Sequence, residues 1–194
     1  VYVSLGFQDV SSHRSGARTG EISASMLARH LSDDNNSFCI IGHSERREFQ
    51  NETDEVISEK LKRLLETDII PVVCIGETFK DFEKGLTKEV LKNQIDVIFN
   101  SLESDKNIIV AYEPVWAIGT GLVPSPEELV SIFKYIRDTV NKLNKKYASI
   151  KLLYGGSVTP DNASSLIDTD HIDGLLIGGA SLIAKKFIDI CSTI

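Results

Sequence analysis

Short apolar runs, each followed by a segment with helical periodicity, recur six times along the 194 residues. The runs are continuously apolar rather than alternating, which is typical of strands buried on both faces of a sheet. They cover residues 1–7, 37–42, 69–76, 107–112, 150–156 and 172–179. Such alternation predicts an α/β fold with a parallel sheet and helical crossovers. The periodicity leaves open whether the sheet is doubly wound or part of a closed barrel.

Helix start signals support this pattern. In the sequence SPEE, Ser125 is a predicted N-cap, Pro126 fits the first turn, and Glu128 completes a capping box. Further start signals are Thr53, Thr87 and the Thr-Pro pair at 159–160. The helix after SPEE carries one apolar stripe, formed by Leu129, Ile132, Phe133, Ile136, Val140 and Leu143. Because the chain has no linker or low-complexity stretch, we expect one domain over residues 1–194.

Composition restricts the partners. A formal net charge of −7 gives a surface that attracts neither nucleic-acid phosphates nor anionic lipids, so we expect no nucleic acid and no membrane as partner. No stretch approaches the roughly 18 apolar residues of a membrane span, and the first residues show no export signal. The three cysteines are Cys39, Cys74 and Cys191. Their odd number and wide spacing suit neither a disulfide framework nor a zinc site. We expect reduced, buried thiols in a cytoplasmic protein.

Glycine pairs follow the last two predicted strands, in YGGSV and IGGAS. Each pair alone is most simply a tight strand-to-helix turn. However, glycine allows close approach of the backbone to a ligand, and free N–H groups at a helix start bind anions without a basic side chain. The loops after the last two strands of a β/α barrel often form a phosphate site. We therefore predict that Ser157, Gly178 and Gly179 contact a phosphate through backbone amides.

A carboxylate ends the fourth predicted strand, in AYEPVWAIGTG. A surface or ion-paired role is the simplest explanation for a glutamate, but Glu113 in a water-poor setting would be basic enough to take a proton from carbon. The stiff segment that follows, flanked by glycine, is predicted to form a lid that excludes water. The lid residues are Pro114, Val115, Trp116, Ala117, Ile118 and Thr120. Core packing is the alternative for Trp116.

A histidine ends the second predicted strand, in IIGHSERR. A single strand-end histidine is usually structural or solvated, but His43 precedes a dense polar cluster. We expect a neutral imidazole that donates to a substrate carbonyl oxygen and stabilises an enediolate. Ser44, Glu45 and the two arginines after them are expected to orient it. The alternative is that SERR is only a solvated helix start.

The motifs GHSERR, CIGET, AYEPVWAIGTG, YGGSV and DGLLIGGASL together resemble those of the triosephosphate isomerase family in order and spacing. The resemblance implies a (β/α)8 TIM barrel that interconverts dihydroxyacetone phosphate and D-glyceraldehyde 3-phosphate in glycolysis and gluconeogenesis. It implies Glu113 as the proton-shuttling base and His43 as the electrophile. Substrate binding would fall to Gly119, Ser157, Gly178 and Gly179. Neither a metal nor an organic cofactor is implied.

The resemblance also bears on assembly. In the family, the long polar connection at residues 8–23 inserts into a second subunit, so Thr19 is an expected homodimer contact; an ordinary surface loop is the alternative. A complete barrel has eight βα units in about 250 residues. Six units are predicted here, and the family's first two, with an Asn and a Lys in an NWK signature, are not found.

Three interpretations stay open. The first is that the chain is a genuine isomerase, and the second is that it is a non-catalytic remnant that retains phosphate binding or dimer contacts. The third is that it belongs to another phosphate-binding barrel enzyme, such as a sugar-phosphate epimerase. For the 194-residue chain alone we expect little or no turnover. We also expect unpaired strands at the edges of an open barrel.

Overall fold

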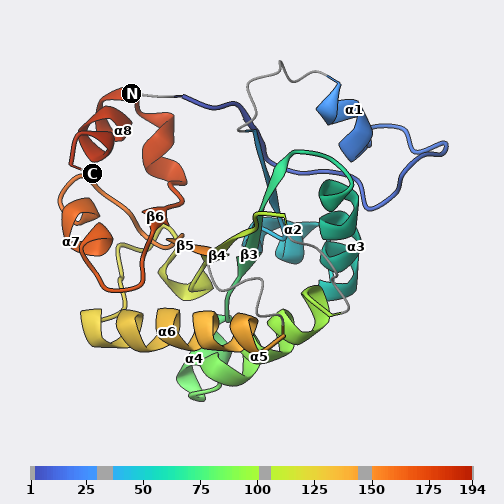
Figure 1. Cartoon of the computed structure of the whole chain (residues 1–194). Coiled ribbons are helices and arrows are strands. Elements are labelled where there is room, and N and C mark those ends of the chain that lie inside the picture. Colours follow the sequence, from blue (N-terminus) through green and yellow to red (C-terminus); the bar gives the residue numbers. More distant parts are fainter. Residues whose placement is uncertain (1–2, 30–36, 101–105, 144–149, 194) are drawn as a thin grey trace.

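The computed structural model describes residues 3–29, 37–100, 106–143 and 150–193, and its six strands form one parallel sheet (Figure 1). The strands are β1 (Gly6–Phe7), β2 (Phe38–Ile41), β3 (Ile70–Ile75), β4 (Ile109–Tyr112), β5 (Lys151–Tyr154) and β6 (Gly174–Leu175). Every predicted run contains one of them, although residues 1 and 2 of the first run lie outside the described part. Each strand pairs in parallel with the next one along the chain. A doubly wound sheet reverses its order at a switch point, so this order favours the barrel alternative.

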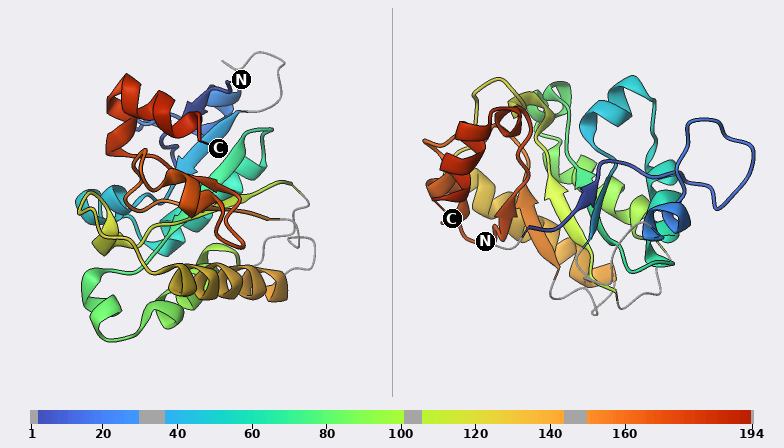
Figure 2. Two further views of the ribbon diagram at one scale, coloured as in Figure 1. Left: turned by 90° about the vertical axis from the view of Figure 1, so that its left-hand side faces the viewer. Right: turned by 90° about the horizontal axis from the view of Figure 1, so that it is seen from above.

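Helices connect the strands and cover one face of the curved sheet, with α3, α5 and α6 side by side (Figures 1 and 2). The helices are α1 (Ala24–Ala28), α2 (Ser44–Phe49), α3 (Asp54–Leu65), α4 (Phe79–Glu83), α5 (Thr87–Ile98), α6 (Pro126–Leu143), α7 (Ala163–Ile167) and α8 (Ala184–Cys191). Two short 3-10 helices are η1 (Val115–Ala117) and η3 (Gly179–Leu182). Among the described residues, no helix is long and apolar enough to cross a bilayer.

Alternate residues of β2, β3, β4 and β5 pack into two apolar clusters. Val73 and Val110 belong to the larger cluster, which also contains helix residues such as Ile57 and Phe133. Cys74 and Ala111 belong to a smaller cluster on the opposite, inner face of the sheet. The strands are therefore apolar on both faces, as their continuous hydrophobicity predicted.

Two helix starts are confirmed. In α6 the Ser125 backbone N–H donates to Glu128 Oε2 at 2.8 Å, and the Glu128 N–H donates to Ser125 Oγ at 3.3 Å, which is the predicted capping box. Thr53 is the N-cap of α3, where its side chain accepts from the Val56 N–H. Along α6, four of the six stripe residues are buried, whereas Ile132 is half-buried and Leu143, in the last turn, is 43% exposed.

A third start signal, Thr87, coincides with the first residue of α5, although the cap position is held by Leu86 without a side-chain hydrogen bond. Two local predictions are wrong. The Thr-Pro pair at 159–160 opens a turn, and α7 begins only at Ala163, because the Asn162 side chain accepts from the Thr159 N–H and closes that turn first. Cys191 is exposed, since α8 buries its neighbour Ile190 and turns the next side chain toward solvent.

Candidate active site

The strand-end loops surround a cavity of about 830 Å³. Parallel strands present their carboxyl ends at one side of a sheet, and residues that follow them meet there. The predicted site residues that line the cavity are His43, Glu45, Glu113, Ile118, Gly119, Ser157, Gly178 and Gly179. With Gln8 and Asp9 of the loop after β1, which also line it, five of the six strand-end loops contribute to a common space. Ser44, Thr19 and the remaining lid residues do not line it.

Glu113 and His43 face each other inside this cavity. Glu113 follows β4 directly and is only 2% exposed. Its Oε1 lies 3.0 Å from His43 Nε2, and its Oε2 accepts from the Ser44 backbone N–H at 3.0 Å. The backbone of Ser44 thus contacts Glu113, whereas Ser44 was expected to orient His43. A carboxylate held away from water beside an imidazole is the pairing that acid–base chemistry at carbon requires.

The hydrogen bonds of His43 indicate which ring nitrogen carries the proton. Nδ1 accepts from the Glu45 backbone N–H at 3.3 Å, at the start of α2, so Nδ1 is unprotonated and the proton lies on Nε2, toward Glu113. A neutral imidazole satisfies both contacts. The hydrogen bond to Glu113 raises the pKa of His43 while burial opposes this. The Glu45 carboxylate itself is 71% exposed, so this residue orients the ring through its backbone.

The turn that carries His43 is held by Gly42 and Arg47. Gly42 has φ of +70°, and a Cβ there would lie 2.9 Å from Ile57 Cδ1, so both conformation and space favour glycine. Arg47 donates to the Gly42 carbonyl at 2.9 Å and to the Cys74 carbonyl at 3.1 Å, and it pairs with Asp54 at 2.6 Å. The second arginine of SERR thus fixes the turn that precedes His43.

The first arginine belongs to an ion cluster that sequence analysis missed. Arg46 lies 2.6 Å from Glu52 and 3.0 Å from Asp9, and Lys60 contacts the same two carboxylates at 2.5 and 2.6 Å. Lys60 is only 4% exposed. The cluster joins the loop after β1 to α2 and α3. Residues so far apart in sequence give no local signal of their pairing.

Behind Glu113, the backbone of Gly76 leaves no room for a side chain. A Cβ on Gly76 would lie 1.8 Å from the Glu113 carbonyl oxygen. On α5, Gln94 accepts from the Gly76 N–H at 2.9 Å and donates to the Gly76 carbonyl at 3.0 Å. These two hydrogen bonds fix the peptide against which Glu113 packs. The glycine of CIGET was a visible signal, whereas its partner Gln94 was not.

The predicted lid is anchored at Glu77. Trp116 donates through Nε1 to Glu77 Oε1 at 2.9 Å, and the Tyr112 hydroxyl donates to the same oxygen at 3.1 Å. Burial raises the pKa of Glu77, which is 0% exposed, and these hydrogen bonds act against that shift. Trp116 is therefore a polar anchor of its segment as well as an apolar contact, and core packing alone does not describe it.

The predicted phosphate loops present unused donors. In the described part of the chain, the backbone N–H groups of Ser157, Gly178 and Gly179 donate no hydrogen bond. The Ser157 hydroxyl contacts the lid instead, donating to the Ala117 carbonyl at 2.6 Å and accepting from the Gly121 N–H at 3.1 Å. Lys186, which sequence analysis did not select, also lines the cavity and forms no ion pair with any described residue.

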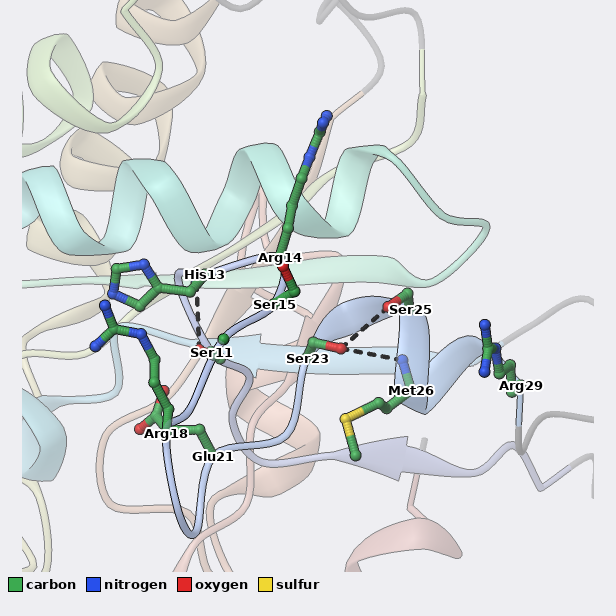
Figure 3. A pocket seen from close by; sticks show the side chains of 11 residues that line it. Ser11, His13, Arg14, Ser15, Arg18, Glu21, Ser23, Ser25, Met26 and Arg29 are labelled. Atoms are coloured by element: carbon green, nitrogen blue, oxygen red, sulfur yellow. Dashed lines mark hydrogen bonds between the residues drawn. The ribbon is translucent and has the colours of Figure 1, made fainter.

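Thr19 lies in the long connection after β1, away from these residues. The connection is pinned by the Ser11 N–H, which donates to the Ile22 carbonyl at 2.9 Å, and by Arg14, which pairs with Glu66 at 2.7 Å. It projects beyond the sheet (Figure 2). A separate cavity of about 310 Å³ lies between this connection and α1, and Figure 3 shows the His13 and Arg18 side chains at this cavity. Thr19 itself is exposed.

The fold and the site together define a β/α-barrel protein whose site is suited to acid–base chemistry, since a buried carboxylate faces an imidazole N–H at the ends of parallel strands. Within the described ranges, no group of three or more His, Cys, Asp or Glu side chains is arranged to hold a metal ion.

Comparisons with known proteins define the family. The family model described as triosephosphate isomerase matches residues 1–194. The triosephosphate isomerases of Hahella chejuensis and Herminiimonas arsenicoxydans are each 46% identical to the chain, with 97% of the chain and 75% of each relative covered. The crystal structure of triosephosphate isomerase from Bartonella henselae superimposes with a TM-score of 0.86 at 34% identity, over 98% of this chain and 77% of that one. The chain belongs to the triosephosphate isomerase family.

Membership confirms two predictions, the isomerase class and the TIM-barrel fold. The six parallel strands are the corresponding part of such a barrel. The epimerase alternative is not supported, because the relatives at 41–46% identity are named triosephosphate isomerases.

Proposed function

We propose that the cavity binds a phosphorylated triose, that Glu113 carries a proton between its two neighbouring carbons, and that His43 polarises the carbonyl group between them. The observation that carries this proposal is the distance of 3.0 Å between Glu113 Oε1 and His43 Nε2 inside the cavity. Family membership supplies the reaction, the interconversion of dihydroxyacetone phosphate and D-glyceraldehyde 3-phosphate.

The proton accounting follows from the hydrogen bonds. Glu113 takes a proton from the carbon next to the carbonyl, and an enediolate forms whose oxygen accepts from His43 Nε2–H. The protonated Glu113 then returns the proton to the neighbouring carbon, and the hydroxyl proton on the first carbon's oxygen passes by way of His43 Nε2 to the former carbonyl oxygen, so that the carbonyl group ends on the first carbon. Before this, the carboxylate must leave the Ser44 N–H and the His43 ring, and the substrate oxygen takes its place at Nε2. Exclusion of water from the closed cavity protects the reactive enediolate from side reactions.

The phosphate end of the substrate is assigned to the opposite loops. Ser157, Gly178 and Gly179 supply the unused N–H groups described above, and Gly119 approaches from the lid. Backbone amides at the start of η3 hold an anion without a basic side chain. Such local binding is needed because the chain has a net charge of −7. The residues from Pro114 to Thr120 then form a lid over the substrate, connected to Ser157 through Ala117.

Assembly and location belong to the same proposal. A homodimer contact at Thr19 is supported by the pinned, projecting connection in which this exposed residue lies. A cytoplasmic location is supported by Cys39, Cys74 and Cys191, which are all free thiols.

An isomerase assay tests the catalytic roles, run on the 194-residue protein at a concentration high enough to measure the low turnover expected of this chain. We expect Glu113→Gln to lower kcat by roughly 10²–10⁴-fold, the usual contribution of a positioned general base. Glu113→Asp should retain part of that rate because it keeps a carboxylate. Glu48→Gln on α2, an exposed carboxylate outside the cavity, is the matched control and should leave the rate unchanged. Turnover that survives Glu113→Gln would contradict the proposal.

Phosphate binding by the same protein distinguishes the non-catalytic remnant from the active isomerase. If the unaltered chain shows no turnover but binds inorganic phosphate, and Gly178→Val abolishes that binding, the remnant interpretation holds for the chain. Gly178 has open space around its Cβ position, so the added side chain occupies the cavity without an internal clash.

A further inference from the structure

The single tryptophan of the chain is held on two sides. Its Nε1–H donates to Glu77 at 2.9 Å, and its ring stacks on Phe82, with ring centroids 4.2 Å apart and an interplanar angle of 26°. Trp116 lies in η1, within the segment proposed as the lid, and Phe82 lies in α4. The lid is therefore joined to α4 by a face-to-face aromatic contact.

The helix that presents Phe82 is firmly built despite its length. Thr78 caps α4, since its hydroxyl accepts from the Asp81 N–H at 3.3 Å and donates to the Asp81 carboxylate at 2.6 Å. The chain then returns on itself, with the Leu86 N–H donating to the Asp81 carbonyl at 2.9 Å. Because α4 directly precedes α5, which packs on the sheet, Phe82 is a fixed platform for a mobile partner.

We infer that Phe82 is a positioning residue that holds the lid in the position seen here. Phe82 is absent from the described residues that line the cavity, so any effect on the substrate must pass through Trp116. This inference rests on the proposed function in one respect, that residues 114–120 move over the substrate. Any movement of the indole away from α4 breaks the stack.

The stack sets an expected magnitude. In addition to the effect of the apolar area that it buries, an aromatic pair of this kind changes the ratio of two conformations by a factor of roughly two to ten. Loss of the Phe82 ring should raise the fraction of displaced lid by this factor. If phosphate binding requires the displaced lid, apparent phosphate affinity should rise by the same factor, because less free energy is spent on the displacement.

The experiment uses fluorine NMR on the 194-residue protein grown with 5-fluorotryptophan, which labels Trp116 alone. Inorganic phosphate is the probe, and the ratio of displaced to resting Trp116 signal is the readout. We expect Phe82→Leu to raise this ratio roughly two- to ten-fold and Phe82→Tyr, which keeps the ring, to leave it nearly unchanged. Phe79→Leu is the matched control, because Phe79 lies on the same helix, is 55% exposed and should not alter the ratio.

The outcomes separate this inference from the proposed function. An unchanged ratio in Phe82→Leu, an equal change in Phe79→Leu, or a Trp116 signal that stays at its resting position at saturating phosphate would each overturn the role of Phe82. A raised ratio in Phe82→Leu without phosphate binding would support the stack and refute the phosphate site. Loss of turnover in Glu113→Gln does not depend on either result.

Discussion

At the residue scale, the paired position of His43 and Glu113 makes stability depend on pH. The hydrogen bond to Glu113 raises the pKa of His43 above its ordinary value of 6.5. A raised folded-state pKa means that the folded protein binds the proton more tightly, so the stabilisation is fully present below about pH 6.5 and is lost as pH rises through the folded-state value. Glu113→Gln removes the cause, and this part of the pH dependence should disappear.

Two measurements check this prediction. Urea denaturation between pH 5.5 and about 8 should show the folded protein losing stability with rising pH, and the slope should be smaller in Glu113→Gln. The NMR titration of the His43 ring should move to lower pH in the same variant. His13→Gln, in the connection after β1, provides the control for titration of another histidine. A His43 titration that is identical with and without the Glu113 carboxylate would contradict the assignment.

Sequence analysis could select these two residues because strand-end position, residue type and local neighbours are all local information. It could not give the mode of contact. Ser44 and Glu45 were expected to act as polar side chains, yet both act through backbone N–H groups at the start of α2. Backbone donors have no residue-type signal, so only the turn at Gly42 and the helix start could have indicated them.

At the element scale, Gln94 joins α5 to the end of β3 by two hydrogen bonds with Gly76. We expect Gln94→Leu to destabilise the fold by about 2 kcal/mol, because a backbone donor and acceptor lose their partners in a place with little access to water. Since Gly76 packs against the Glu113 backbone, kcat should fall while KM changes little. Urea denaturation and steady-state kinetics measure the two effects.

Asn93→Leu supplies the control, because Asn93 is its exposed neighbour on α5. Gln94→Glu retains the acceptor for the Gly76 N–H but loses the donor to the carbonyl. Its free energy of unfolding should therefore lie between those of Gln94→Leu and Asn93→Leu. Equal stability of Gln94→Leu and Asn93→Leu would show that the two hydrogen bonds between Gln94 and Gly76 do not stabilise the fold.

The elements themselves were predictable where one physical cause dominated. Continuous apolar runs gave all six strands, and the capping box gave the start of α6, because both patterns depend on near neighbours. Thr87 marked the start of α5 but not its cap, because a threonine is acceptable both as a cap and as a first helical residue, and Leu86 holds the cap position. The Asp9–Lys60–Glu52 cluster and the Gln94 clamp are contacts across the fold, for which the sequence carries no periodic signal.

At the scale of the whole molecule, the sheet has two edge strands, β1 and β6, and two different surfaces near them are suited to association. One is the connection that carries Thr19. The other is the apolar face of η3 and α8, where Leu182 is 87% and Ile188 61% exposed. An exposed apolar face of this kind favours self-association without specific geometry, whereas the pinned connection offers a fixed shape.

The two surfaces predict different behaviour in sedimentation velocity. If the connection forms the proposed homodimer, Thr19→Asp should convert a dimer at micromolar concentration into a monomer, because a charge at the contact must be desolvated without a partner. Ile188→Lys should leave that dimer intact while reducing any larger, concentration-dependent species. The reverse pattern, in which Ile188→Lys yields the monomer and Thr19→Asp does not, would assign the association to α8. If the unaltered protein is a monomer at the same concentration, the proposed homodimer is wrong. The connection that carries Thr19 would then make contacts only within its own chain.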